Sequence, residues 1–285
     1  MQLPPMVQVT PLALVAVTVA VVHEMGLRWL ALRQTPEHRL RTRRRSWLLY
    51  AGLAGLVLVA SGPLERWSMT WLSVHMVTHV LLMFYLPPLL VAGGATVPLL
   101  YALPVDQRRR LLTAYHRWRS LAWLRGLVRG VTEPIVAIVL FNGVMVLWHI
   151  PAVFDWASYH QWAMDWLMTP SFVVVGVLFW RIILPSHPHP PRGSTRVQVL
   201  AVVVTVLEML ILAMAMAIFT KNPWYSMNVA MDGATAALRD QRYAAAILWI
   251  CGDFWAVPAL VLVGYRVYGR DGGVSASLER ALGRV

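Results

Sequence analysis

Seven long apolar stretches constrain the fold of this chain more than any other feature of its sequence. They cover residues 9–28, 46–64, 70–93, 134–152, 164–184, 197–219 and 243–265. A helix needs about 20 mainly apolar residues to cross a bilayer, and each stretch has about that length. Transmembrane β-strands are about half as long and alternate polar with apolar residues, which these stretches do not. We therefore predict an all-α, polytopic transmembrane helical bundle of about seven spans.

The composition leaves little sequence for a soluble domain. Of the 285 residues, 58% are hydrophobic and 13% are charged, whereas about a quarter of a typical soluble domain is charged. We expect residues 1–270 to form a single transmembrane domain and residues 271–285 to form a short cytoplasmic tail. In the third stretch, Pro87-Pro88 and Gly93-Gly94 predict a kink or a helix end.

The placement of Arg and Lys predicts the orientation of the spans. Of the 25 basic residues, 21 fall in the first, third and fifth connections and in the C-terminal tail, and four fall on the other side. Because cytoplasmic loops are enriched in basic residues, we predict an outside amino terminus and a cytoplasmic carboxyl terminus in the bacterial plasma (inner) membrane. The net charge of +12 then reflects topology and contact with membrane lipids, and we expect no binding to nucleic acid.

Cysteine chemistry is nearly absent from the sequence. Cys251 is the single cysteine, so the chain has no thiol pair for metal binding. Any metal would be held by His, Met and carboxylate side chains. No nucleophile–base motif, phosphate loop or His-Glu-x-x-His motif occurs, so an enzyme is not indicated.

The third stretch carries the strongest candidate site. His75, His79 and Met83 are spaced by four residues, which places them on one stripe of an α-helix. Imidazole suits copper and zinc, and a thioether selects copper(I). The alternative is structural, because a histidine can hydrogen-bond to a neighbouring helix and a methionine can simply pack.

A third histidine lies at a similar predicted depth. His149 is near the outer end of the fourth stretch, and Met145 is one turn deeper on the same face. Three histidines from neighbouring spans could therefore meet in the outer leaflet. Taken alone, His149 could equally be a capping or interfacial residue.

Three carboxylates are weaker candidates. Asp165 begins the fifth stretch and fits an exposed helix start, whereas Glu208 and Asp253 lie deep in the sixth and seventh stretches. An ionisable group inside a membrane needs a partner or a proton. Glu208 and Asp253 could bond to each other or to a histidine.

Several motifs resemble those of the CtaG-type cytochrome c oxidase assembly factors. The longest runs from Gly62 through His75-Met76-Val77-Thr78-His79 to Pro87-Pro88. It is followed by Leu147-Trp148-His149-Ile150-Pro151, by Phe179-Trp180, and by Asp240-Gln241 leading into Leu248-Trp249. The order and spacing of these motifs cover roughly residues 45–265.

This resemblance implies a membrane protein that assembles a haem–copper terminal oxidase with its subunits as partners, through copper delivery or insertion. The family's residues correspond to His75, Met76, His79 and His149, and to the Asp240-Gln241 motif. Where the family shows a His and a Glu-His pair at the start of the fifth span, this chain carries Asp165, Met168 and Thr169. Two other functions stay open: a b-type haem protein with two axial histidines, and a metal-free scaffold. A transporter has only the two deep carboxylates in its favour.

Overall fold

The computed structural model describes residues 10–270 of the chain, and within them it is mostly helical and has no β-strand. The predicted tail, 271–285, lies outside the described residues. The longer helices are α1 (Pro11–Ala31), α2 (Pro36–Ser61), α7 (Val105–Arg117), α9 (Pro134–His149), α12 (Thr169–Ile183), α13 (Thr195–Ala217), α15 (Ala234–Asp253) and α16 (Ala256–Arg270). Shorter helices are α3 (Pro63–Thr70), α4 (Leu72–Val80), α5 (Leu86–Gly93), α6 (Thr96–Tyr101), α8 (Ala122–Val131), α10 (Pro151–Ser158), α11 (Gln161–Ala163) and α14 (Ser226–Asp232). Two π-helical segments, η1 (Leu81–Tyr85) and η3 (Met164–Met168), and a 3₁₀ turn, η2 (Arg119–Leu121), complete the set.

The apolar helices make this a multi-pass membrane protein, and the predicted all-α bundle is confirmed. Among the described residues, four helices are long and apolar enough to cross a membrane, and two bent pairs could each add one span. The bends are 45° between α2 and α3 and 76° between the α8 region and α9. The seventh predicted span is interrupted, because α15 ends at Asp253 and α16 begins at Ala256. The count of seven and the orientation therefore stay predictions.

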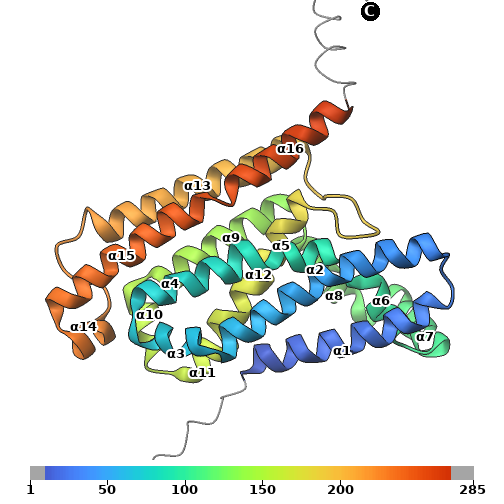
Figure 1. Ribbon diagram of the computed structural model, residues 1–285, viewed down its shortest axis with the longest axis horizontal. Coiled ribbons are helices and arrows are strands. Elements are labelled where there is room, and N and C mark those ends of the chain that lie inside the picture. The colour runs from blue at the N-terminus through green and yellow to red at the C-terminus, as the bar shows by residue number, and fades with distance from the viewer. Residues whose placement is uncertain (1–9, 271–285) are drawn as a thin grey trace, which may run out of the picture.

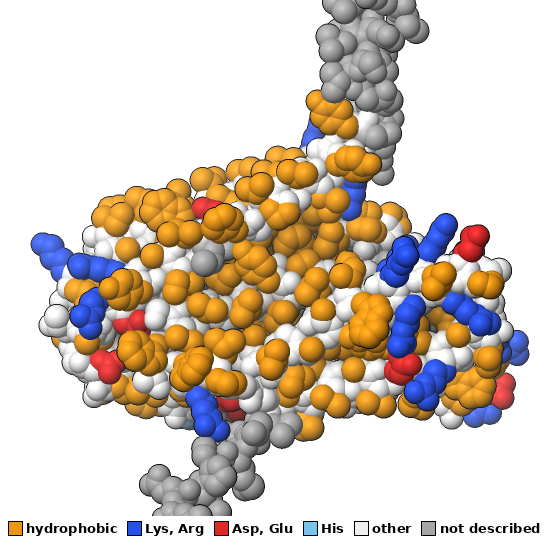
Figure 2. Space-filling view, viewed as in Figure 1, with side chains coloured by type: hydrophobic (Ala, Val, Ile, Leu, Met, Phe, Trp, Pro, Cys, Tyr) orange, Lys and Arg blue, Asp and Glu red, His pale blue; other side chains and the backbone are white. Residues whose placement is uncertain are grey.

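The helices form a central group with a pair of long helices on either side (Figure 1). The central group comprises α4, α5, α9 and α12. One flank consists of α1 and α2, with α2 against α5, and the other consists of α13 beside α15 and α16, with α15 against α4. Hydrophobic side chains cover the middle of the visible face, and Lys and Arg gather mainly at the end where α1 joins α2 (Figure 2). This pattern suits a bundle whose midsection faces lipid.

Two prolines explain the π-helical segments. Pro87 has no N–H group and leaves the carbonyl of Met83, four residues earlier, without its helical donor. The helix widens over η1, where the N–H of Leu86 donates to the carbonyl of Leu81. The indole Nε1 of Trp180 on α12 lies 3.3 Å from the free Met83 carbonyl and donates to it. Pro170 stands in the same relation to η3, just after Thr169.

The expected end of the third span is confirmed at its glycine pair. Gly94 adopts the left-handed conformation, with φ 64° and ψ 49°, and terminates α5 directly after Gly93. A residue with a Cβ is disfavoured in this conformation. The chain then turns into α6 and the basic connection that contains α7 and α8.

Candidate functional site

The site is built around α4, whose first turn is fixed by a distant carboxylate. Oδ2 of Asp240 on α15 accepts hydrogen bonds from the backbone N–H groups of Leu72 (2.6 Å) and Ser73 (3.3 Å). These N–H groups have no partner within a helix, and a negative charge there is also favoured by the helix dipole. Asp240 therefore holds the start of α4, three residues before His75.

Gln241 ties the same part of α15 to the connection after α13. Its Oε1 accepts from the N–H of Trp224 (2.7 Å), and its Nε2 donates to the carbonyl of Met216 (2.9 Å). The Asp240-Gln241 motif is thus a clamp between helices, with no contact to a ligand required to explain it.

The three histidines predicted to converge do lie together. The ring centroids of His75 and His79 are 4.4 Å apart, and those of His79 and His149 are 5.4 Å apart. Their side chains are 2–6% exposed. Phe154 packs edge-on against His75, and Phe172 packs against His79. These rings come from α10 and α12, so four elements enclose the histidines.

His149 directs an electron pair toward a thioether. Its Nδ1 lies 2.7 Å from the carbonyl of Met145, and a carbonyl can only accept, so Nδ1 carries the proton. In the neutral ring Nε2 then holds a lone pair, and it lies 3.3 Å from Sδ of Met76. The thioether has no proton to donate either. Two electron-pair donors thus face each other in a buried site.

Three further ring nitrogens of the cluster have no hydrogen-bond partner among the described residues. Both ring nitrogens of His79 and Nε2 of His75 are buried and lack a hydrogen-bond partner among the described residues. A buried polar atom without a partner costs about 1–3 kcal/mol. Such atoms are therefore available to a ligand.

A cavity of about 40 Å³ adjoins His75 and His79. It is large enough for water, which needs about 10–15 Å³ by this kind of measure. Its polar and sulfur-bearing lining comes from Glu65, Ser68, Met69, Thr78, Gln161, Met164, Asp165, Met168 and Thr169. Asp165, Met168 and Thr169, which stand where the resembling family has other ligands, therefore face the same space as the histidines. Nε2 of Gln161 donates to Oδ1 of Asp165 at 3.0 Å.

Glu65 is a cavity residue that we did not select from the sequence. It lies on α3, beyond the apolar stretch that we assigned to the second span. The 45° bend between α2 and α3 brings α3 back toward α4. In the sequence, a carboxylate two positions after Pro63, at the end of an apolar run, does not indicate such a bend.

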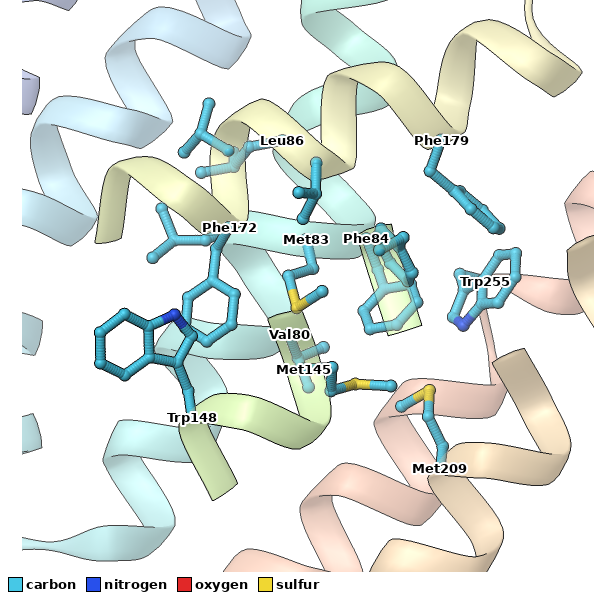
Figure 3. Close-up of a cluster of buried hydrophobic side chains, with 14 of the residues drawn as sticks. Val80, Met83, Phe84, Leu86, Met145, Trp148, Phe172, Phe179, Met209 and Trp255 are labelled. Carbon is cyan, nitrogen blue, oxygen red and sulfur yellow. The ribbon is translucent and has the colours of Figure 1, made fainter. Parts of the chain in front are cut away.

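Met83 does not line the cavity, although the spacing of four placed it on the stripe of His75 and His79. The stripe assumed a continuous α-helix, and η1 begins at Leu81, so the angular step changes between His79 and Met83. Leu82 faces the cavity instead. Met83 lies in the hydrophobic cluster with Val80, Phe172 and Met145 (Figure 3). Its role as a ligand stays a prediction.

Glu208 and Asp253 do not line the cavity either. Both carboxylate oxygens of Glu208, and Oδ1 of Asp253, are buried without a hydrogen-bond partner among the described residues. The pairing of these carboxylates with each other or with a histidine is therefore not observed in the described part of the chain.

Tyr225 closes the site at the end of α9. Its hydroxyl donates to the carbonyl of His149 at 3.3 Å, and its ring packs on Phe154. Burial, followed by the nearby Asp155 carboxylate, raises the pKa of Tyr225, so this hydroxyl keeps its proton. Oδ1 and Oδ2 of Asp155 accept from the N–H of Ser226 at 2.9 and 3.1 Å, which docks α14 onto α10.

The donor set is rich in histidine and methionine. Among residues 10–270, no group of three or more His, Cys, Asp or Glu side chains is arranged to hold a metal ion. What the described site offers is imidazole nitrogen beside thioether sulfur, and this combination suits copper(I).

Comparison with known proteins decides the family. The model of the cytochrome c oxidase caa3 assembly factor family matches residues 25–270. The chain belongs to this family. The resemblance drawn from the motifs is thereby confirmed.

Three curated relatives of this chain come from mycobacteria. Uncharacterized protein Mb0105 of Mycobacterium bovis and Uncharacterized protein MT0111 of Mycobacterium tuberculosis are each 26% identical to it over 251 residues, which are 85% of this chain and 37% of the relative. Uncharacterized protein ML1998 of Mycobacterium leprae is 27% identical over 157 residues, which are 52% of this chain and 22% of the relative. The chain thus spans little more than a third of the length of the first two relatives and less than a quarter of the third. No solved structure gives a significant match.

Proposed function

We propose that this chain binds copper(I) transiently and delivers it to a haem–copper cytochrome c oxidase during assembly. The observation that carries the proposal is the 3.3 Å contact between Nε2 of His149 and Sδ of Met76, with His79 beside them. Metal–nitrogen and metal–sulfur bonds are about 2.0 and 2.3 Å long, so both atoms can reach one ion. In the proposed site His75, His79, His149 and Met76 are the ligands, and copper is cargo.

The chemistry of these atoms favours a soft monovalent ion. The contact between the lone pair on Nε2 of His149 and the thioether sulfur of Met76 is not a hydrogen bond and stabilises neither atom. A cation between the two atoms would be attracted to both. Imidazole and thioether together select copper(I) over harder cations. The unpartnered nitrogens of His75 and His79 can complete its coordination.

The cavity provides the route to this site. Glu65 and Asp165 bring two carboxyl groups to the cavity that reaches His75 and His79, and carboxylates attract cations. Met168 adds a thioether on the same route. The cavity lies at the end of the bundle where α1 begins, which the distribution of Arg and Lys predicts to be outside. We accordingly expect loading from the outer side of the plasma membrane.

The test is copper content of the purified protein. His75→Ala/His79→Ala/His149→Ala is compared with wild type after loading with copper(I) and removal of weakly bound metal. The matched control is His23→Ala, because His23 is also a fully buried histidine, hydrogen-bonded to Ser46 between α1 and α2. We expect about one copper in wild type and in the control, and none in the triple variant. Equal copper in all three proteins would overturn the site.

The alternative functions give different results in the same preparation. A Soret band would indicate haem, although a cavity of about 40 Å³ leaves no room for a porphyrin beside these rings. Full oxidase assembly by the triple variant would instead select a metal-free scaffold. The copper proposal requires oxidase activity to fall in cells that carry the triple variant and to recover with added copper or with the wild-type gene.

A further inference from the structure

A second cavity lies in the apolar part of the bundle, away from the histidines. It has a volume of about 510 Å³ and runs between α1 and α2 on one side and α12 on the other, with α5 at its floor. α1 packs along α2 and α6 and meets the fifth span at η3, which leaves the space between α1 and α12 open. We call this space the α1–α12 groove.

The α1–α12 groove has an apolar lining and a charged end. Its walls are mostly aliphatic, as in Val15, Leu53 and Val177, and within residues 10–270 no Asp or Glu lines it. Val15 and Val174 are each 57% exposed, so the groove opens sideways, toward lipid. Arg181 and Ser186 lie at the end nearer the Arg-rich connections.

Arg181 has no carboxylate to neutralise it among the described residues. The ion pairs in the described part of the chain join Glu24 to Arg28 and to Arg43. Arg181 is half-buried, and the charge that acts on it is that of another cation, Arg192. A guanidinium so placed offers several N–H donors to an anion such as phosphate.

Arg45 adds a further positive charge near the same end of the groove. The connection after α12 follows Ser186 with His187, which packs against the turn at Gly94. Burial lowers the pKa of His187, and the positive charge of Arg45 lowers it further. The positive charges of Arg45, Arg181 and Arg192 near this rim favour an anion there.

The part of the groove along α12 is about as long as one leaflet is thick. Along α12 it extends from Pro170 to Arg181, which is roughly 16 Å at 1.5 Å per residue. This is about half of the roughly 30 Å hydrocarbon thickness of a bilayer. An acyl chain in the groove would therefore place its headgroup at Arg181.

We propose that the α1–α12 groove binds an anionic phospholipid of the leaflet that faces the Arg-rich connections, with its phosphate at Arg181 and an acyl chain along α12. The apolar walls would contact the acyl chain, and the cations at the rim would bind the phosphate of the headgroup. The occupied groove would fill the space between α1 and α12 and so stabilise the position of α1, whose first residues reach the histidine cavity.

The test uses delipidated full-length protein in detergent and native mass spectrometry. Dioleoyl phosphatidylglycerol is added in one arm and dioleoyl phosphatidylcholine, with the same chains and no net charge, in the other. We expect wild type to retain phosphatidylglycerol preferentially. Arg181→Gln should weaken phosphatidylglycerol binding about fivefold, as expected for one basic group at an anionic membrane surface, and leave phosphatidylcholine unchanged.

Two further variants separate the groove from general charge. Arg110→Gln removes an exposed cation of α7 that does not line the groove and should change neither lipid. Val174→Trp fills the open side of the groove and should remove the binding of phosphatidylglycerol while the protein still elutes as a folded species. Equal retention of both lipids by wild type, or unchanged phosphatidylglycerol binding in Arg181→Gln, would overturn the proposal.

Discussion

At the residue scale, the site depends on hydrogen bonds that hold its histidines and their helix in place. Met145 fixes the tautomer of His149 through its carbonyl, and Asp240 fixes the first turn of the helix that carries His75. A metal ligand in proteins commonly has its orientation set by such second contacts. We therefore regard Asp240 as a positioning residue for α4.

Asp240→Ala should weaken both the fold and copper binding. Loss of a capping side chain costs about 0.5–2 kcal/mol, so the variant should unfold at a lower temperature in detergent and bind copper(I) less tightly. Asp232→Ala is the matched control, because Asp232 is exposed at the end of α14. Copper affinity equal to wild type in Asp240→Ala would show that Asp240 does not position the histidines.

Part of this site could be predicted from the sequence, and the limits are physical. His75, His79 and His149 were found because the predicted direction of each span fixes the depth of its residues. Residues at equal depth on neighbouring spans can meet. The Met76 contact and the Asp240 cap join residues 73 and 168 positions apart, and no local pattern encodes a contact at that distance. Met83 failed to follow the stripe because a proline four residues later changed the helix period.

At the element scale, α12 packs closely against the irregular segment η1. A Cβ added at Gly176 on α12 would lie 2.6 Å from Cγ of Pro87 and 3.0 Å from the carbonyl of Met83. The absence of a side chain at Gly176 therefore lets α12 approach η1 closely enough for Trp180 to reach the Met83 carbonyl. The apolar stretches predicted these helices, but neither π-helical segment.

Gly176→Ala should destabilise the protein, whereas Gly143→Ala should not. Overpacking of this kind costs about 1–3 kcal/mol. Gly143 lies in α9 with nothing within 4 Å of an added Cβ, and alanine there should stabilise the helix by about 0.5–1 kcal/mol. Thermal unfolding of both variants in the same detergent measures the difference, and equal midpoints would contradict the proposed close packing.

At the scale of the whole molecule, the distribution of charge divides the bundle into two ends. The connection that contains α7 and α8 carries seven Arg residues, and the opposite end carries the cavity with Glu65 and Asp165. If the basic end is cytoplasmic, the copper site opens to the outside. The function of the site therefore depends on the orientation of the chain.

Cysteine labelling tests this orientation. In a background in which Cys251 is replaced by Ser, we introduce Ser194→Cys before α13 and Asn222→Cys after it; both positions are exposed. A membrane-impermeant maleimide added to intact spheroplasts should label the Asn222→Cys protein and should label the Ser194→Cys protein only after the membrane is opened. The reverse pattern would place the carboxyl terminus outside and close the proposed route for copper.

The contact between His149 and Met76 is the most direct point at which to test the copper proposal. X-ray absorption spectroscopy of the copper(I)-loaded protein should detect nitrogen ligands together with a sulfur ligand at about 2.3 Å. Met76→Leu should remove the sulfur signal, and Met209→Leu, which alters another fully buried methionine in the core, should leave it intact. A spectrum without sulfur, or one that Met76→Leu does not change, would contradict the account.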